Sequence, residues 1–185
     1  MRIVLASASP RRRELLGVMG LGEFEIMTAP GEEQEFEDLP PKQRVEAIAL
    51  DKARRSAGVL DDDALVISAD TLVFMDGAGL GKPRDAEHAV GMLTSLSGRE
   101  HQVATGVAMI YRGRELVDAE VTKVRFAALS DEEIKAYVAT GEPMDKAGSY
   151  GIQGRGSVLI EGIGGIIRKN WNFSSALSFR KNRTE

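Results

Sequence analysis

Short apolar runs and amphipathic stretches alternate along this chain, in the pattern typical of a mixed α/β protein. Continuous apolar runs indicate buried strands, and apolar residues recurring every three or four positions indicate helices. The pattern predicts strands at 2–6, 23–29 and 64–74, a hairpin over 101–126 and a strand at 157–160. It predicts helices from Pro10, over 42–57, over 86–96 and after Ser130. We find no internal repeat or linker, so we expect one domain over residues 1–165.

The predicted helix ends carry recognisable capping residues. Ser9 is a favoured N-cap residue, and Pro10 after it is favoured at the first helical position. We expect the helix that begins there to bury Leu15, Leu16, Val18 and Met19. Ser130 and Glu133 have the spacing of a capping box, which predicts another helix start.

Three consecutive arginines, at positions 11–13, occupy the first turn of the first predicted helix. Cations there oppose the partial positive charge of the helix N-terminus, where acidic residues are favoured. An anion bound by the free N–H groups of that turn would reverse the penalty. The stretch therefore predicts an anion-binding site.

Composition limits the partners that such a site could have. The 185 residues are 43% hydrophobic and 28% charged, with no cysteine and a net charge of −4. The absence of cysteine excludes disulfides and thiolate metal sites. We expect a cytoplasmic protein, because no signal-like segment or membrane-length apolar run is present. The acidic balance argues against duplex nucleic acid as a partner, and a small anionic ligand remains compatible.

Asp70 is the sharpest candidate for chemistry, because it interrupts the apolar run 64–74. A buried carboxylate is costly unless it is paired or solvated, so we expect Asp70 to face a cleft. There it could hold a divalent cation or take a proton from water. The structural alternative is that Asp70 ends the strand and caps a turn.

Other candidates are ambiguous by themselves. Lys52 lies on the apolar stripe of the helix predicted over 42–57 and could simply extend its ammonium to the rim. Lys82 could be a solvated loop lysine, and Glu33 part of a solvated acidic loop. Gln153, in a glycine-rich segment, could read a base edge or serve as a turn amide.

Several short motifs in one order resemble the Maf family. They are "SASPRR" after the first strand, "EE" at 32–33, "DKA" at 51–53, "SADT" at 68–71, "GKP" at 81–83 and "EPMDKAGSYGIQG" at 142–154. The resemblance implies a mixed α/β sheet with flanking helices and two lobes around a central cleft, similar to inosine triphosphate pyrophosphatases. It also implies a metal-dependent hydrolase that converts nucleoside triphosphates into monophosphates and pyrophosphate.

The same resemblance implies roles for individual residues. Asp70 would accept a proton from water, Glu33 and Asp70 would bind Mg²⁺ or Mn²⁺, and Lys52 and Lys82 would complete the catalytic group. The substrate-binding residues would be Ser9, Arg11, Arg12, Thr71 and Gln153. Thr71 and Gln153, with Arg12, resemble the specificity residues of the branch that acts on dTTP, UTP and modified pyrimidine triphosphates.

The resemblance weakens at the C-terminus. After Gly165 the chain reads as a basic tail over 166–185, for which we hypothesise a shifted reading frame; a divergent tail with its own short helix is the alternative. We expect a nucleoside triphosphate as partner, with a homodimer left open, and neither nucleic acid nor membrane. The family also implies a weaker link to arrest of septum formation. The alternative function is a nucleotide-binding regulator of cell division with weak or no catalysis, because of the altered C-terminus.

Overall fold

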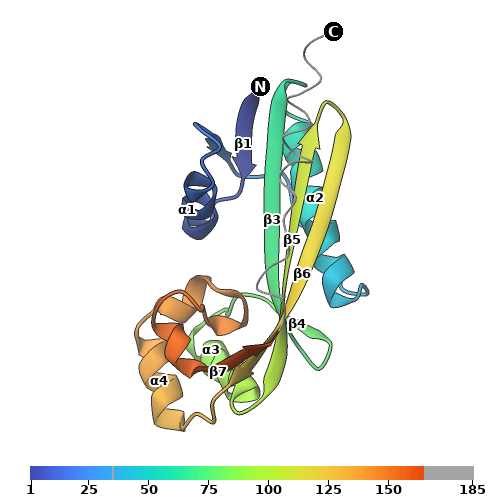
Figure 1. Ribbon diagram of the computed structural model, residues 1–185. Coiled ribbons are helices and arrows are strands. Elements are labelled where there is room, and N and C mark those ends of the chain that lie inside the picture. Colours follow the sequence, from blue (N-terminus) through green and yellow to red (C-terminus); the bar gives the residue numbers. More distant parts are fainter. Residues whose placement is uncertain (35, 165–185) are drawn as a thin grey trace.

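The computed structural model describes residues 1–34 and 36–164, which form a seven-stranded sheet with four α-helices and three 3-10 helices (Figure 1). The strands are β1 (Arg2–Ala6), β2 (Glu25–Met27), β3 (Ala64–Met75), β4 (Ala78–Leu80), β5 (Glu100–Tyr111), β6 (Arg114–Phe126) and β7 (Ile160–Gly164). The helices are α1 (Pro10–Val18), α2 (Pro41–Ala57), α3 (Ala86–Leu96), α4 (Asp131–Ala139), η1 (Glu142–Asp145), η2 (Ala147–Ser149) and η3 (Arg155–Leu159).

The sheet is mixed, with the order β2-β1-β3-β5-β6-β7, and β4 pairs with β3 beyond this path. β1 runs parallel to β2 and β3, whereas the other strand pairs are antiparallel. The long strands β3, β5 and β6 extend through the whole molecule, with β1, α1 and α2 around one end and α3, α4 and the 3-10 helices around the other (Figure 1). The long strands therefore connect two lobes.

Alternating side chains of β3 divide the core between the two faces of the sheet. Val66 packs with the alanines of α2, and Ser68 donates a hydrogen bond to the carbonyl oxygen of Ala49 on that helix. On the opposite face, Ile67 packs with Leu16 of α1. The same face continues into the second lobe, where residues of β3 pack against α3 and α4. The even-numbered positions thus face α2.

A glycine lets α2 approach the sheet beside Asp70. Gly106 of β5 is the register partner of Asp70 on β3. A Cβ at Gly106 would lie 2.2 Å from the carbonyl oxygen of Val45, a backbone atom of α2. Any side chain there would push the helix away, so the absence of one keeps α2 against the strand that carries Asp70.

Most of the predicted elements are confirmed, including the hairpin turn at Arg112 and Gly113 and the Ser130 capping box. Two local predictions are wrong. Residues 155–159 form a 3-10 helix, and the strand begins at Ile160. Leu16 is the buried residue of α1, whereas the other three apolar residues predicted to be buried there are exposed. The predicted N-cap position of Ser9 is confirmed, although its side chain makes no capping hydrogen bond.

Two further expectations concern the C-terminal tail and membrane-spanning helices. The basic tail over 166–185 lies outside the described residues, and nothing in the structure tests the reading-frame hypothesis. Among the helices that the structure describes, none is long and apolar enough to cross a membrane.

His101 is a buried histidine in the second lobe. It is 2% exposed, and a hydrogen bond of 2.7 Å joins its Nε2 to Tyr150 Oη. Burial lowers the pKa of His101 from 6.5 to about 4, so the native state holds it neutral. The unfolded chain therefore binds a proton between these pH values that the folded chain does not.

We expect the free energy of unfolding to fall by about 3 kcal/mol through His101 as the pH falls from 6.5 to 4, because each pKa unit corresponds to about 1.4 kcal/mol. Above pH 6.5 this contribution to the pH dependence vanishes. Urea unfolding of the wild type and of His101→Gln across this range measures the difference in slope. The other of the two histidines, the half-buried His88, provides the control His88→Gln. Equal slopes for wild type and His101→Gln would contradict the assignment.

Candidate active site between the two lobes

The candidate site lies where β3 loses its neighbours on one edge. β1 pairs with residues 64–67 of β3, and β4 pairs with residues 73–75. Between these segments, residues 68–72 of β3 have β5 as their strand neighbour among the residues that the structure describes. Asp70 and Thr71 lie in this interval. Because successive side chains of a strand point to opposite faces, Asp70 lies on the face of Ser68 and α2, and Thr71 lies on the other face.

Asp70 forms the centre of a charged cluster. It is 8% exposed, and its Oδ1 accepts a hydrogen bond of 2.6 Å from Lys52 Nζ of α2. The same ammonium lies 3.0 Å from Glu33 Oε2, in the loop before α2. The sequence-predicted Glu33, Lys52 and Asp70 are therefore brought together, with the lysine between the two carboxylates. The alternative in which Asp70 merely caps a strand end does not apply, since β3 continues to Met75.

The loop that follows β1 brings Arg12 to the opposite face of the same interval. Arg12 Nη1 donates to Ser7 Oγ at 3.2 Å, and Nη2 donates to Thr71 Oγ1 at 3.5 Å. Burial lowers the pKa of Arg12, an effect that the nearby charges of Asp70 and Glu33 oppose. A half-buried guanidinium whose hydrogen bonds here go to two hydroxyl groups is suited to bind an anion, because Arg donates in a fixed planar geometry.

The start of α1 carries the remaining residues of the "SASPRR" motif. Ser9 N–H donates to Ser7 Oγ at 3.3 Å, which folds the loop into the helix. Pro10 occupies the first helical turn, and no acidic residue compensates the helix dipole there. Arg13 is exposed, whereas Arg11 and Arg12 are half-buried. Two of the three arginines thus face the interior of the site.

Lys82 lies on the other side of the interval, after β4. It is exposed, and Gly81 before it accepts a hydrogen bond of 3.0 Å from the N–H of Gly148. Gly148 in turn abuts Val73 of β3, where a Cβ would lie 2.7 Å from a valine methyl group. The "GKP" turn and the glycine-rich segment are therefore held against the strand that carries Asp70. The structure gives no direct contact between Lys82 and the Asp70 cluster.

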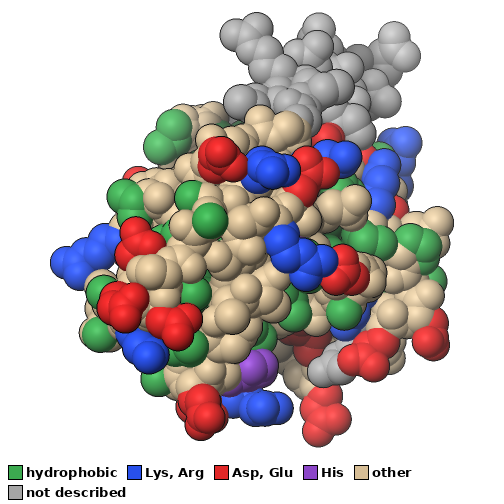
Figure 2. All heavy atoms as spheres, turned by 90° about the horizontal axis from the view of Figure 1, so that it is seen from below, with side chains coloured by type: hydrophobic (Ala, Val, Ile, Leu, Met, Phe, Trp, Pro, Cys, Tyr) green, Lys and Arg blue, Asp and Glu red, His purple; other side chains and the backbone are tan. Residues whose placement is uncertain are grey.

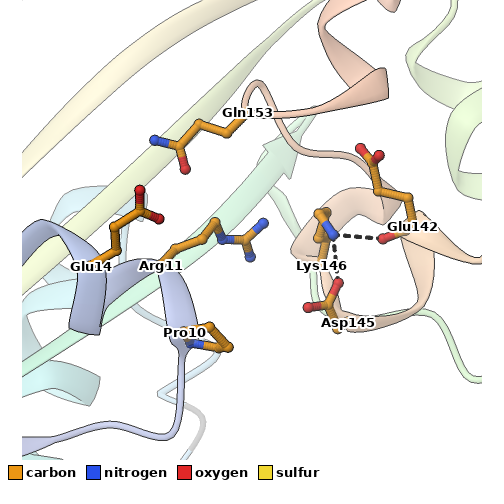
Figure 3. A pocket seen from close by; sticks show the side chains of 7 residues that line it. All are labelled: Pro10, Arg11, Glu14, Glu142, Asp145, Lys146 and Gln153. Carbon is orange, nitrogen blue, oxygen red and sulfur yellow. Dashed lines mark hydrogen bonds and ion pairs between the residues drawn. The ribbon is translucent and has the colours of Figure 1, made fainter.

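A cleft of about 510 Å³ opens beside this site, between α1 and the segment that follows α4. Its walls are formed by Pro10, Arg11, Glu14, Glu142, Asp145, Lys146 and Gln153. In Figure 3 the Arg11 guanidinium extends from α1 toward the opposite wall, below Gln153 and beside Lys146 and Asp145. Lys146 Nζ donates to Asp145 Oδ1 at 2.6 Å and to the main-chain oxygen of Glu142 at 2.7 Å.

Sequence reasoning assigned Arg11 and Gln153 to the site but gave no role to Glu142, Asp145 or Lys146. Lys146 is 9% exposed, and a Cβ at Gly151 would lie 2.9 Å from its side-chain carbons and 3.3 Å from an Arg11 nitrogen. A buried lysine and an arginine from the other lobe therefore meet at a glycine. The signal for Lys146 was present in the "DKAG" motif, but a lysine beside an aspartate is indistinguishable from a surface ion pair in sequence.

The residues of the Asp70 cluster fit a divalent cation that is held jointly with substrate. Within residues 1–34 and 36–164, no three acidic or histidine side chains gather closely enough to form a complete metal site. Two carboxylates, Glu33 and Asp70, nevertheless converge on one ammonium. Mg²⁺ is commonly bound by one or two carboxylates together with phosphate oxygens and water. Lys52 Nζ contacts Glu33 Oε2 and Asp70 Oδ1, so the second oxygen of each carboxylate would serve Mg²⁺ or Mn²⁺ while the lysine stays in place.

The charged side chains on one face of the molecule are of both signs (Figure 2). Figure 2 shows acidic and basic side chains interspersed over the face seen from below, with hydrophobic side chains between them. Duplex binding uses an extended basic surface. The part of this face that is described carries no continuous patch of positive charge.

The fold is shared with a solved structure of another protein, the Staphylococcus aureus Ham1 protein. The two chains are 16% identical with a TM-score of 0.50, and the match covers 69% of this chain and 72% of that one. This likeness concerns the fold, and it confirms the expected class of a mixed sheet with flanking helices.

The chain belongs to the family described as Maf-like protein, whose model matches residues 2–169. It is 55% identical over 166 residues to the dTTP/UTP pyrophosphatase of Moorella thermoacetica, covering 89% of this chain and 84% of that protein. It is 51% identical over 164 residues to the dTTP/UTP pyrophosphatase of Symbiobacterium thermophilum, again covering 89% and 84%. The resemblance drawn from the motifs is therefore confirmed.

Proposed function

We propose that this chain is a pyrophosphatase that hydrolyses dTTP, UTP and modified pyrimidine nucleoside triphosphates to monophosphate and pyrophosphate, as a housekeeping activity. The observation that carries the proposal is the cluster of Glu33, Lys52 and Asp70 at the interrupted edge of β3, with Arg12 on the opposite face. The printed names of the two relatives, both dTTP/UTP pyrophosphatases, support the substrate class.

Asp70 is the group best placed to activate water. Water attacks the α-phosphorus, its proton passes to the Asp70 carboxylate, and the bond between the α-phosphorus and the bridging oxygen breaks to release pyrophosphate. Lys52 orients the carboxylate through its 2.6 Å hydrogen bond. The same ammonium can also offset negative charge that develops on the phosphate oxygens.

The phosphate chain would lie along the start of α1. Arg12, Arg11 and the first-turn N–H groups after Ser9 supply positive charge and hydrogen-bond donors on this side. Lys82 supplies a cation from the opposite side, after β4. These fixed donors hold the triphosphate in one orientation, so that the α-phosphorus faces Asp70.

We propose that Glu33 and Asp70 bind Mg²⁺ or Mn²⁺ together with the phosphates. A divalent cation there neutralises charge on the non-bridging and leaving oxygens. Arg11, Arg12, Lys52 and Lys82 exceed the two carboxylates by two positive charges, fewer than the negative charges of a triphosphate, so an excess of negative charge remains. This electrostatic argument supports the requirement for a metal.

We propose that the nucleoside end occupies the cleft of about 510 Å³ lined by Arg11 and Gln153. The cleft lining has two basic and three acidic side chains, a balance that suits an uncharged base and sugar better than phosphate. The Gln153 amide has both a donor and an acceptor for a pyrimidine edge. Arg12 and Thr71 would fix the position of the phosphates relative to that base.

A nucleotide panel tests the proposal most directly. The purified chain is incubated with individual triphosphates and Mg²⁺ or Mn²⁺, and pyrophosphate is separated from orthophosphate. We expect pyrophosphate, with dTTP and UTP turned over faster than purine triphosphates. Binding without release of pyrophosphate from any triphosphate would favour the alternative of a nucleotide-binding regulator.

Replacing Arg12 with Ala is expected to raise KM for triphosphates by about 10-fold, because a charge-assisted contact to the bound phosphates is lost. kcat should change less, since Arg12 contacts Ser7 and Thr71 rather than the carboxylate that activates water. Steady-state kinetics with dTTP measures both constants. Arg13→Ala removes an exposed arginine from the same helix turn and serves as the control. An unchanged KM in Arg12→Ala would exclude Arg12 from the phosphate site.

A further inference from the structure

The loop that carries Gln153 is anchored at both ends. Before it, Tyr150 is 7% exposed and hydrogen-bonds to the buried His101 at 2.7 Å. After it, the N–H of Arg155 donates to Glu142 Oε2 at 3.0 Å, and the N–H of Gly156 donates to Glu142 Oε1 at 3.1 Å. The loop between these points therefore has little freedom to move.

Glu142 is itself tied to the core of the second lobe. Tyr137 of α4, which is 6% exposed, donates its hydroxyl to Glu142 Oε1 at 3.0 Å. Burial by itself would raise the pKa of Glu142, but hydrogen bonds from the backbone of Gly156 and Arg155 and from Tyr137 give a net lowering. The anchor is thus an ionised carboxylate at neutral pH.

Two glycines let the loop close on this carboxylate. Gly154 has φ 116° and ψ −155°, a conformation that residues with a Cβ rarely adopt. A Cβ there would also lie 3.1 Å from the Glu142 carboxylate oxygens. A Cβ at Gly156 would lie 2.6 Å from the carbonyl oxygen of Gly151. The backbone is therefore packed against Glu142 on one side and against itself on the other.

The same residue also orders the opposite wall of the cleft. The main-chain oxygen of Glu142 accepts a hydrogen bond from Lys146 Nζ, while its carboxylate points away from Lys146 (Figure 3). Glu142 thus uses its backbone to hold the lysine and its side chain to hold the turn after Gln153. These contacts fix the lysine and the turn relative to each other.

We propose that Glu142 is a positioning residue for base discrimination, which fixes the loop 151–154 so that the Gln153 amide meets the base in one orientation. The inference rests on the proposed function, in which Gln153 reads the pyrimidine. Gln153 is exposed, so its own packing does not hold it in place. A hydrogen bond discriminates only where donor and acceptor directions are fixed, and the anchored loop provides that constraint.

The experiment compares Glu142→Gln, Gln153→Ala and the double variant in the full chain. The measured quantity is kcat/KM for dTTP divided by kcat/KM for dGTP, because this ratio reports discrimination between substrates. We expect Glu142→Gln to lower the ratio by about 10-fold, since an amide cannot accept all three hydrogen bonds. KM for dTTP should rise more than kcat falls. The double variant should discriminate no worse than Gln153→Ala alone, because both changes remove one interaction.

Two further variants separate positioning from general destabilisation. Tyr137→Phe removes one of the three hydrogen bonds to the carboxylate, so it should lower the ratio in the same direction but less. Glu133→Gln weakens the capping box of α4 without contacting the loop, and it should leave the ratio unchanged. Hydrogen exchange should quicken at residues 151–156 in Glu142→Gln but not in Glu133→Gln.

Each outcome has a distinct meaning. An unchanged ratio in Glu142→Gln with a lowered ratio in Gln153→Ala overturns the positioning role and leaves the proposed function intact. An unchanged ratio in Gln153→Ala overturns base reading by this residue and the inference that depends on it. An equal loss of discrimination in Glu133→Gln would assign the effect to the stability of the second lobe and overturn the positioning role of Glu142. Should the wild type release no pyrophosphate, unchanged exchange at 151–156 in Glu142→Gln would still overturn the anchoring.

Discussion

Replacing Asp70 with Asn is expected to lower kcat for dTTP by about 10³-fold, the range that a positioned general base contributes. The substitution keeps the shape of the side chain and an oxygen that can accept from Lys52 Nζ, so the geometry of the cluster should persist. The substitution removes the group that takes a proton from water. It also removes one of the negative charges that would bind the cation. Turnover at saturating dTTP and Mg²⁺ measures the loss.

A second aspartate on the same strand region supplies a matched control. Asp76 follows β3, is exposed, and pairs with Arg99 at 2.8 Å. Its φ of 52° lies in the left-handed region, which Asn tolerates well. Asp76→Asn should therefore keep both the fold and kcat. A wild-type kcat in Asp70→Asn would remove Asp70 from the role of base, provided that circular dichroism shows both variants folded.

The chemistry of Asp70 and Lys52 could be predicted because each residue conflicts with its local pattern. An ionisable residue in an apolar strand and a lysine on an apolar helix stripe both need a compensating contact, and the structure provides it between them. The interrupted edge of β3 could not be predicted, since it depends on where β1 stops pairing and where β4 begins. Such registers are set by tertiary packing.

The glycine-rich segment shows how tertiary contacts override local preference. "SVLI" at 157–160 has the β-branched, apolar composition of a strand. In the fold, Glu142 accepts hydrogen bonds from the backbone just before it, and residues 155–159 turn into a 3-10 helix. Val158 is consequently 79% exposed while Leu159 is 3% exposed. The hydrogen bonds to Glu142, 13 and 14 residues earlier in the chain, thus accompany a conformation that the local composition does not predict.

The apolar residues of α1 illustrate a different limit. Periodicity identifies a helix but not the area against which it packs. α1 has nine residues and lies over the short strand β1, so Leu16 alone of its residues reaches the core. Val18 remains 81% exposed. The N-terminal end of α1 instead contacts the site, where Arg12 donates to Ser7 and Thr71.

Replacing Lys52 with Met is expected to lower kcat by about 10²- to 10³-fold, because one fixed cation near the developing charge is lost. The methionine retains most of the aliphatic packing on α2 but leaves Asp70 without its ammonium partner. Since Asp70 is 8% exposed, unfolding in urea should also show a loss of about 3 kcal/mol. Both effects follow from the 2.6 Å contact between Nζ and Oδ1.

Two variants distinguish the role of this cation from a general effect on α2. Lys42→Met removes a half-exposed lysine from the same helix, where Nζ lies 3.7 Å from Glu46, and should leave kcat unchanged. Lys52→Arg restores the charge with different geometry, so it should recover most of the stability but only part of kcat. A stability loss without a kcat loss in Lys52→Met would make the lysine purely structural. A kcat loss that Lys52→Arg recovers only in part is the result expected from an ammonium that lies between the two carboxylates.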